Sequence, residues 1–319
     1  MAVYTNIDED DLATLLADFD LGAALSCKGI AEGVENSNYL LETERGRFIL
    51  TLYERRVRAD DLPYFLDLMQ WLAERGFPCP IPMADRQGRM LKTVHGRPAA
   101  LVTFLTGVSV QHPTEEHCRQ AGEGLARLHL AGRGFPHRRE NTLGQHVWAG
   151  MFDAPAAATA ESLWPGLAAR ITSDLEELAR DWPRDLPAGP VHADLFPDNV
   201  FFVGERFAAA IDFYFACDDA LAYDLAVCLN AWAFEPDGRF APERAKAMIE
   251  GYETLRPLSS AERSGLPTLA RGAAIRFFLT RLIDWTATPP GALVRPKDPL
   301  EYAAKLAFFR TLPMGRSLV

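Results

Sequence analysis

The segment 191–200 carries residues whose types and spacing fit the chemistry of phosphoryl transfer. His192, Asp194 and Asn199 form the pattern H-x-D-x-x-x-x-N. Asp212 follows in an Ile-Asp-Phe triplet, eighteen residues after Asp194. One carboxylate can hold a hydroxyl group and take its proton, while an amide oxygen and a second carboxylate can bind Mg²⁺. Phosphoryl transfer needs such a set, because the protein mainly positions the reactants and neutralises charge.

Each of these residues has an expected role. Asp194 is the candidate catalytic base, and Asn199 and Asp212 are the candidate Mg²⁺ ligands. His192 is expected to hold the loop through hydrogen bonds rather than to carry a proton. The alternative for Asp194 and Asn199 is a simple turn, since Asp, Asn and Pro together favour turns. Asp212 follows an apolar run typical of a buried strand, and this pairing favours the functional interpretation.

Composition limits the classes of partner. The chain has 319 residues, of which 48% are hydrophobic and 24% charged, which predicts a globular protein large enough for two lobes. A net charge of −10 argues against a nucleic-acid partner. The five cysteines contain no C-x-x-C pair, so we expect neither disulfides nor zinc, and we expect a cytoplasmic location. No apolar run is long enough to predict a membrane span.

The elements that must position the motif fall into a strand-rich first third and a helical remainder. Before residue 106 we expect a helix over 8–20, strands over 38–43 and 48–53, a helix near 62–72, and strands over 89–94 and 97–105. The polar segment 28–37 forms a glycine-spaced loop ahead of the first strand pair. An α+β, two-lobed architecture with a ligand between the lobes follows from this order.

Beyond residue 106 the pattern is mainly helical. Thr114 is expected to cap a helix, and Leu163 to Leu178 repeat on one face of another. Further helices are expected over 220–232, 242–255, 265–286 and 299–311. The motif region 190–213 is expected to form short strands and loops.

The motif, followed by the segment 219–226 (Asp-Ala-Leu-Ala-Tyr-Asp-Leu-Ala), resembles the aminoglycoside phosphotransferase/choline kinase superfamily. The resemblance implies a bilobal protein-kinase-like fold, with a β-rich N-terminal lobe over 1–105 that covers the nucleotide. Residues 106–319 would form a mainly α-helical lobe for catalysis and acceptor binding. ATP as co-substrate and Mg²⁺ as cofactor are also implied. Asp224 would brace the catalytic loop, and a helix N-terminal acid is the alternative for it.

Other segments resemble, within that superfamily, the bacterial homoserine kinases of the phosphotransferase type. They lie at 29–39, 48–54, 76–82, 230–235 and 276–285. This resemblance implies ATP-dependent phosphorylation of the hydroxyl of L-homoserine in threonine biosynthesis, by a monomer or homodimer without nucleic-acid or membrane partners. The alternatives are a related kinase for choline or an aminoglycoside, and a nucleotide-binding pseudokinase.

The expected nucleotide ligands lie in the first lobe. In the loop, Gly33 would let backbone N–H groups approach the phosphates, and Asn36 and Ser37 would offer side-chain donors. The extended backbone through Thr103 and Leu105 is expected to present groups to adenine. A plain turn and a strand end are the respective alternatives.

One position departs from the pattern of the fold. Thr51 stands on the third strand where kinases of this fold usually carry a lysine that holds the phosphates. The phosphate charge must then be met by Mg²⁺, by loop amides, or by an arginine such as Arg47 or Arg55. We expect Thr51 to lie near the nucleotide.

The acceptor site is expected on the helix over 265–286. Arg281 and Trp285 share one of its faces, and Asp284 lies beside Arg281. Homoserine carries a carboxylate and an ammonium group, which suit an arginine and an aspartate respectively. Trp232 and Glu235 are further candidates. The alternative is a core aromatic stripe with an ion pair on its rim.

Overall fold

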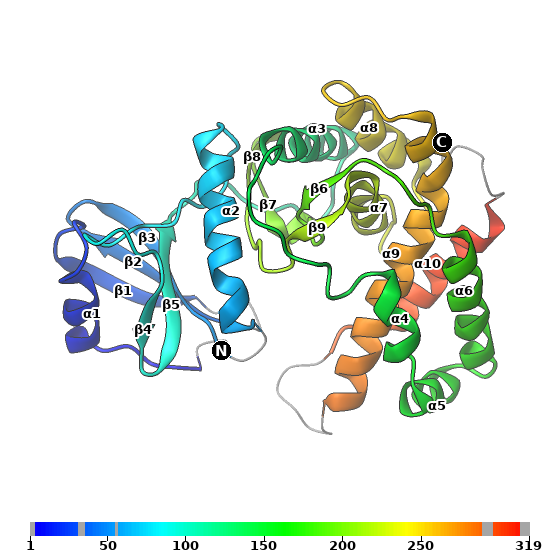
Figure 1. Cartoon of the computed structure of the whole chain (residues 1–319), viewed down its shortest axis with the longest axis horizontal. Helices are drawn as coiled ribbons and strands as arrows, with labels where there is room; N and C mark the ends of the chain where they lie inside the picture. The colour runs from blue at the N-terminus through cyan, green and yellow to red at the C-terminus, as the bar shows by residue number, and fades with distance from the viewer. Residues whose placement is uncertain (1–3, 31–35, 55–56, 289–295, 313–319) are drawn as a thin grey trace.

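The structure, a computed structural model, describes residues 4–30, 36–54, 57–288 and 296–312. A sheet-bearing N-terminal part lies beside a larger, mainly helical C-terminal part (Figure 1). The expected α+β, bilobal architecture is therefore confirmed. We propose that the division lies at 105/106, in the connection between the last strand of the sheet and the next helix.

The N-terminal part is built on one antiparallel five-stranded sheet in the order β1-β2-β3-β5-β4. Its elements are α1 (Glu9–Leu16), β1 (Ala24–Ile30), β2 (Ser37–Thr43), β3 (Gly46–Leu52), the short 3-10 helix η1 (Ala59–Asp61), α2 (Leu62–Glu74), β4 (Lys92–Val94) and β5 (Arg97–Thr103). Gly46 closes the β2–β3 hairpin with a φ of 142°, which glycine adopts without strain. The register places Thr51 opposite Asn38 and Ala100.

Strand β1 was missed in the sequence, where the first strand was expected only at 38–43. It is an edge strand whose residues alternate little between buried and exposed positions. A strand without a buried face gives no period-two pattern, so its residues resemble a loop.

Two separate cores hold the N-terminal elements. Leu12, Leu15 and Leu16 of α1 pack against Leu41 and Leu50 of the sheet in the smaller core. The apolar face of α2, by contrast, belongs to the larger core, which continues through the C-terminal helices. In Figure 1, α2 accordingly lies between the sheet and the helical part.

The C-terminal part contains most of the helices and two small two-stranded sheets, β6-β9 and β7-β8. Its elements are α3 (Glu115–Ala131), α4 (Gln145–Met151), α5 (Ala154–Leu163), α6 (Leu167–Asp181), β6 (Ala188–Val191), η2 (Pro197–Asn199), β7 (Val200–Val203), β8 (Arg206–Ala210), β9 (Cys217–Ala220), α7 (Leu221–Trp232), α8 (Pro242–Glu253), α9 (Ser260–Ala287) and α10 (Leu300–Thr311). Within the described ranges, no helix is long and apolar enough to cross a membrane.

The expected helix cap at Thr114 is confirmed, since its hydroxyl accepts a hydrogen bond from the His117 N–H at 3.2 Å. The prediction of a single helix that contains both Leu163 and Leu178 was wrong. Gly166 has a φ of 81°, which breaks the chain into α5 and α6. Helix α9 begins earlier than expected, because Ser259 and Glu262 form a capping box.

Helices α3 and α8 approach so closely that each needs a glycine at the contact. A Cβ atom at Gly122 would lie 2.1 Å from the carbonyl oxygen of Met248, and one at Gly251 would lie 2.1 Å from that of Arg119. Contacts this short cannot be relieved by a side-chain rotation, because the neighbouring atoms are backbone.

We expect Gly122→Ala to lower the free energy of unfolding by about 1–3 kcal/mol, since the two helices must separate to admit the methyl group. Gly150→Ala in α4 is the matched control, because nothing lies within 4 Å of a Cβ there. The control should gain up to about 1 kcal/mol from helix propensity alone. Urea denaturation of both variants measures the difference, and an equal response would contradict the close contact.

Candidate active site

The motif loop leaves β6 at Val191 and returns through η2 into β7. Val191 and Leu195 are buried and fix it to the core. Two non-glycine residues of the motif have left-handed backbone, Ala193 with a φ of 60° and Asp212 with a φ of 64°. Such conformations cost on the order of 1–3 kcal/mol each and persist only where the surroundings enforce them.

Asp224 of α7 enforces the backbone of the loop. Its fully buried carboxylate accepts the N–H groups of His192 at 2.7 Å and Ala193 at 2.8 Å. His129 of α3 contacts the same carboxylate at 3.0 Å. Burial raises the pKa of Asp224, but the hydrogen bond to His129 and those from the loop backbone outweigh it, so that the pKa lies below its usual value. The carboxylate is therefore ionised and holds the loop from the helix behind it.

His192 joins the two halves of the motif. Its Nδ1 accepts the N–H of Asp194 at 3.3 Å, and its Nε2 lies 2.9 Å from the carbonyl oxygen of Ile211, directly before Asp212. Because Nδ1 accepts, the ring proton must be on Nε2, which donates to Ile211. Burial of the ring is the main cause that lowers the pKa of His192. A neutral histidine thus ties the loop to the segment that carries Asp212.

Asn199 brings Asp194 and Asp212 together. Its Nδ2 donates to the carbonyl oxygen of Asp194 at 2.8 Å and to the carboxylate at 3.3 Å. The backbone N–H of Ile211 donates to the carbonyl oxygen of Asn199 at 3.0 Å, which places Asp212 next to it. Burial raises the pKa of Asp194 to about 8; Arg276 opposes this shift and Asp212 reinforces it.

The donor set fits a nucleotide-bound magnesium ion. The Asn199 side-chain oxygen accepts no hydrogen bond from any residue that the structure describes, and the backbone of Asn199 is bonded to Ile211, the residue before Asp212. No group of three or more His, Cys, Asp and Glu that could hold a metal occurs in the described part of the chain. Mg²⁺ in kinases needs only one or two protein oxygens, because phosphate and water complete its shell.

The expected nucleotide residues are only partly placed near the motif. Thr51 is buried, and its hydroxyl donates to the Asn38 side chain at 2.8 Å. Close by in sequence, Tyr53 contacts Tyr214, two residues after Asp212, with 3.1 Å between their hydroxyl oxygens. Thr51 therefore lies on a strand whose end contacts the Asp212 segment.

Ser37 does not have the expected role. Its fully buried hydroxyl accepts the Tyr4 N–H at 2.8 Å and donates to the Glu54 carboxylate at 2.7 Å, so no donor is left for a phosphate. Asn36 is also buried, and its side-chain oxygen accepts the Glu54 N–H at 3.4 Å. These hydrogen bonds link the start of β2 to Tyr4 and Glu54. Gly33 and Arg55 lie outside the described residues.

In the segment 103–105, which connects the two lobes, some backbone groups make no hydrogen bond within the described residues. The Thr103 N–H donates to the Ile81 carbonyl oxygen, and the Thr103 hydroxyl accepts a hydrogen bond from the Ile81 N–H. Leu105 makes no backbone hydrogen bond with any residue of the described ranges. Arg47 stacks on Phe104 with 4.4 Å to the ring centroid, so it lies at the joint.

Of the expected acceptor residues of α9, Arg281 contacts the segment at the N-terminal end of α10. Arg281 donates to the Asp298 carbonyl at 3.0 Å and to the Glu301 carboxylate at 2.5 Å. Trp285, one turn further, is 38% exposed. Asp284 is partly exposed and lies on the same stretch of α9.

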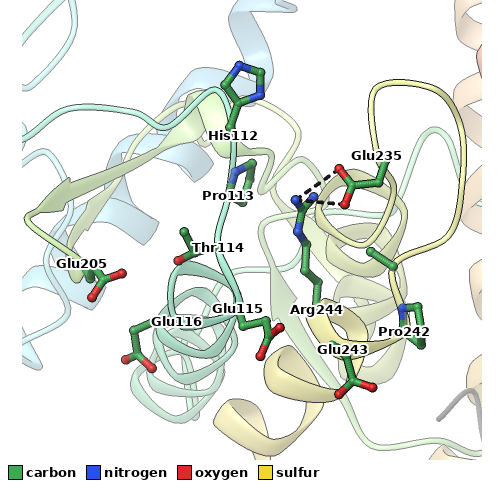
Figure 2. Close-up of a pocket in the computed structure, with 11 residues that line it drawn as sticks. His112, Pro113, Thr114, Glu115, Glu116, Glu205, Glu235, Pro242, Glu243 and Arg244 are labelled. Carbon is green, nitrogen blue, oxygen red and sulfur yellow. Dashed lines mark hydrogen bonds and ion pairs between the residues drawn. The ribbon is translucent and has the colours of Figure 1, made fainter.

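Two candidate acceptor residues are not brought to the motif as ligands, and those expectations are corrected. Trp232 is 1% exposed, and its indole N–H donates to the Leu195 carbonyl at 2.8 Å, so that it supports the loop from below. Glu235 pairs with Arg244 in a different pocket, between the starts of α3 and α8 (Figure 2). That pocket contains no residue of the motif.

Sequence reasoning missed Arg276 of α9, which contacts the motif loop directly. It is 3% exposed and donates through Nη1 to the Ala193 carbonyl. Its Nη2 lies 4.0 Å from the Asp194 carboxylate. The available signal was a single charge within the apolar run 273–279, since buried charges persist only where they are paired.

The fold and the site together define a phosphotransferase with a protein-kinase-like architecture. The model of the phosphotransferase enzyme family matches residues 26–258, and the chain belongs to this family. Homoserine kinases are among the curated proteins to which the chain is similar. That of Phenylobacterium zucineum is 66% identical over 98% of this chain and 97% of its own length, and that of Rhodospirillum rubrum is 59% identical over 98% and 97%. The resemblance seen in the sequence is thus confirmed.

Solved structures agree on the fold. An amicoumacin kinase superposes with a TM-score of 0.70 at 16% identity, covering 95% of this chain and 92% of its own. A microcompartment-associated aminopropanol kinase gives a TM-score of 0.64 at 19% identity, covering 95% and 97%.

Proposed function

We infer that the chain transfers the γ-phosphoryl group of ATP to the hydroxyl of L-homoserine, giving O-phospho-L-homoserine and ADP. The identity of 66% to a homoserine kinase over nearly the whole length carries this inference. The motif residues needed for phosphoryl transfer are present and adjacent. No observation favours choline or an aminoglycoside as acceptor. The product belongs to threonine biosynthesis.

The proposed chemistry places the acceptor hydroxyl at Asp194. As the hydroxyl oxygen forms its bond to the γ-phosphorus, Asp194 takes the proton, and the bond between that phosphorus and the β–γ bridging oxygen breaks to release ADP. Asn199 orients the carboxylate, while His192 and Asp224 hold the backbone around it. The protein thus contributes mainly positioning.

We propose that the side-chain oxygens of Asn199 and Asp212 hold Mg²⁺. Bound there with ATP, Mg²⁺ supplies neutralisation of phosphate charge. Leu105 would offer backbone groups to adenine, and Thr51 would line the nucleotide site. Because Thr51 carries no positive charge, the phosphate charge would be met by Mg²⁺, by loop amides, or by an arginine such as Arg47 or Arg55.

On the acceptor side we propose Arg281 for the carboxylate and Asp284 for the ammonium group, with Trp285 at the outer edge. Within the described residues, Arg281 bonds to Glu301 and Asp298 through one nitrogen, Nη1, and its other N–H groups could bind a ligand. Phe277 of the same helix packs against Phe196 of the motif loop, with 4.9 Å between the ring centroids.

An ADP-release assay with L-homoserine, choline and kanamycin tests the function. We expect kcat/KM for L-homoserine to exceed that for either other alcohol by at least about 10²-fold, as expected where charged groups recognise the substrate. A preference for choline or kanamycin would overturn the assignment. Retained ATP binding without turnover of any alcohol would indicate a pseudokinase.

Asp212→Asn tests the magnesium site. One ligand charge is lost, so we expect the Mg²⁺ concentration for half-maximal ATP binding to rise by about tenfold or more, with a parallel loss of turnover. Calorimetric titration of ATP at several Mg²⁺ concentrations gives a readout that is independent of turnover. An unchanged Mg²⁺ dependence would exclude Asp212 as a ligand.

The expectations of a cytoplasmic location and of a monomer or homodimer stay predictions. Sedimentation at assay concentration checks the second of them.

A further inference from the structure

The peptide of Ala193 is held from both sides. Ala193 has a left-handed φ of 60° and directly precedes Asp194. Its N–H donates to Asp224 of α7 at 2.8 Å, while its carbonyl oxygen accepts from Arg276 of α9. Helices α7 and α9 thus hold the two peptide groups that flank the strained residue Ala193.

The surroundings of Arg276 fix its guanidinium group in place. It lies over the ring of Phe277 at 4.2 Å and near that of Phe215 at 5.3 Å, and it is 3% exposed. Its contacts to the loop are the Ala193 carbonyl and, at 4.0 Å, the Asp194 carboxylate. Because the guanidinium group is buried and packs on two aromatic rings, we expect it to move less than the loop that it binds.

The Asp194 carboxylate has little other support. Asn199 is its one hydrogen-bond donor in the described part of the chain, at 3.3 Å. The direction of the Asp194 side chain therefore depends on the backbone that carries it. If the Ala193 peptide relaxed from its left-handed conformation, the carboxylate would turn away from the acceptor.

We propose that Arg276 is a positioning residue. It keeps Ala193 in its left-handed backbone conformation and so directs the Asp194 carboxylate toward the acceptor hydroxyl. It acts through the backbone and takes no part in proton transfer. The acceptor named below rests on the proposed function, but the positioning role applies to any alcohol that the enzyme phosphorylates.

The main test is Arg276→Met, which keeps the length of the side chain and removes its donors. We expect kcat to fall by about 10²-fold, as for a displaced catalytic group, while KM for ATP and for L-homoserine changes by less than about threefold. Arg276→Lys restores one donor and should recover about tenfold of that loss. An unchanged kcat in Arg276→Met would overturn the proposal.

The matched control is Arg271→Met, in the same helix. Arg271 is also largely buried, but it pairs with Asp174 and Glu177 and is remote from the loop in its contacts. It should lower the melting temperature with kcat within about twofold of wild type. If both variants lose stability and kcat together, Arg276 acts on folding alone and the proposal fails. Should Arg276→Met not fold, Arg276→Lys and Arg276→Gln give the same comparison.

A rival role for Arg276 is direct binding of the substrate carboxylate. 3-Amino-1-propanol, which is homoserine without its carboxylate, separates the two. A positioning role lowers kcat by the same factor for both acceptors. A tens-fold rise of KM confined to homoserine would overturn the positioning role. If the wild type does not phosphorylate homoserine, the proposed function fails, and the Arg276 comparison is made with the alcohol it does accept.

Discussion

Replacing Asp194 by asparagine should lower kcat for homoserine phosphorylation by about 10²–10⁴-fold, the usual contribution of a positioned acid–base group. The amide has the same shape, so the hydrogen bond from Asn199 and the fold persist, but it cannot take the hydroxyl proton. KM for ATP should change little, because the proposed partner of Asp194 is the acceptor and not the nucleotide. Steady-state kinetics together with thermal melting measure these effects.

Asp198→Asn is the control for this variant. Asp198 is exposed in the same loop. Its replacement by asparagine removes the same charge as Asp194→Asn, at a position that is not proposed to contact the acceptor. Its kcat should stay within about threefold of wild type. Comparable losses in the two variants would mean that the charge of the loop, and not the base at 194, governs the rate.

Asp174→Ala should lower the free energy of unfolding by about 3–5 kcal/mol, the cost of leaving buried charges without their partner. Asp174 of α6 is fully buried and accepts from Arg271 of α9 at 2.9 Å and from Arg310 of α10 at 2.7 Å. Its removal leaves the guanidinium groups of Arg271 on α9 and Arg310 on α10 without the carboxylate between them, and Arg271 keeps only Glu177 as a partner among the described residues. Chemical denaturation measures the loss, which is a large part of a typical total of about 5–15 kcal/mol.

The contrasting variant is Asp181→Ala at the end of the same helix. Asp181 pairs with the largely exposed Arg180, and such surface pairs contribute about 0–1 kcal/mol. Similar losses for Asp174→Ala and Asp181→Ala would show that the buried cluster is not a major source of stability.

The sequence predicted those parts of the site that are local in the chain. Asp194 and Asn199 lie five residues apart, so their spacing in the loop follows from a motif alone. Most helices were also predicted, since their apolar faces pack on one core. The resemblance correctly led us to expect Asp224 behind the loop.

What the sequence could not give is the direction of a side chain and the identity of distant partners. Ser37 has the right type for a phosphate ligand, yet its hydroxyl turns to Glu54. A tryptophan could line an acceptor pocket, yet the indole N–H of Trp232 binds the Leu195 carbonyl oxygen of the loop. Arg276 meets Ala193 across 83 residues of sequence, and only the packing of α9 reveals that contact.

The separate packing of α1 against the sheet has a consequence for how the molecule opens. Because α2 shares the large core with the C-terminal helices, the small core between α1 and the sheet has its own free energy of opening. We expect α1 to open from the sheet at a lower cost than the sheet opens from α2, because Tyr53 and Ala100 share the large core with α2. Hydrogen exchange should then be faster in α1 than in α7.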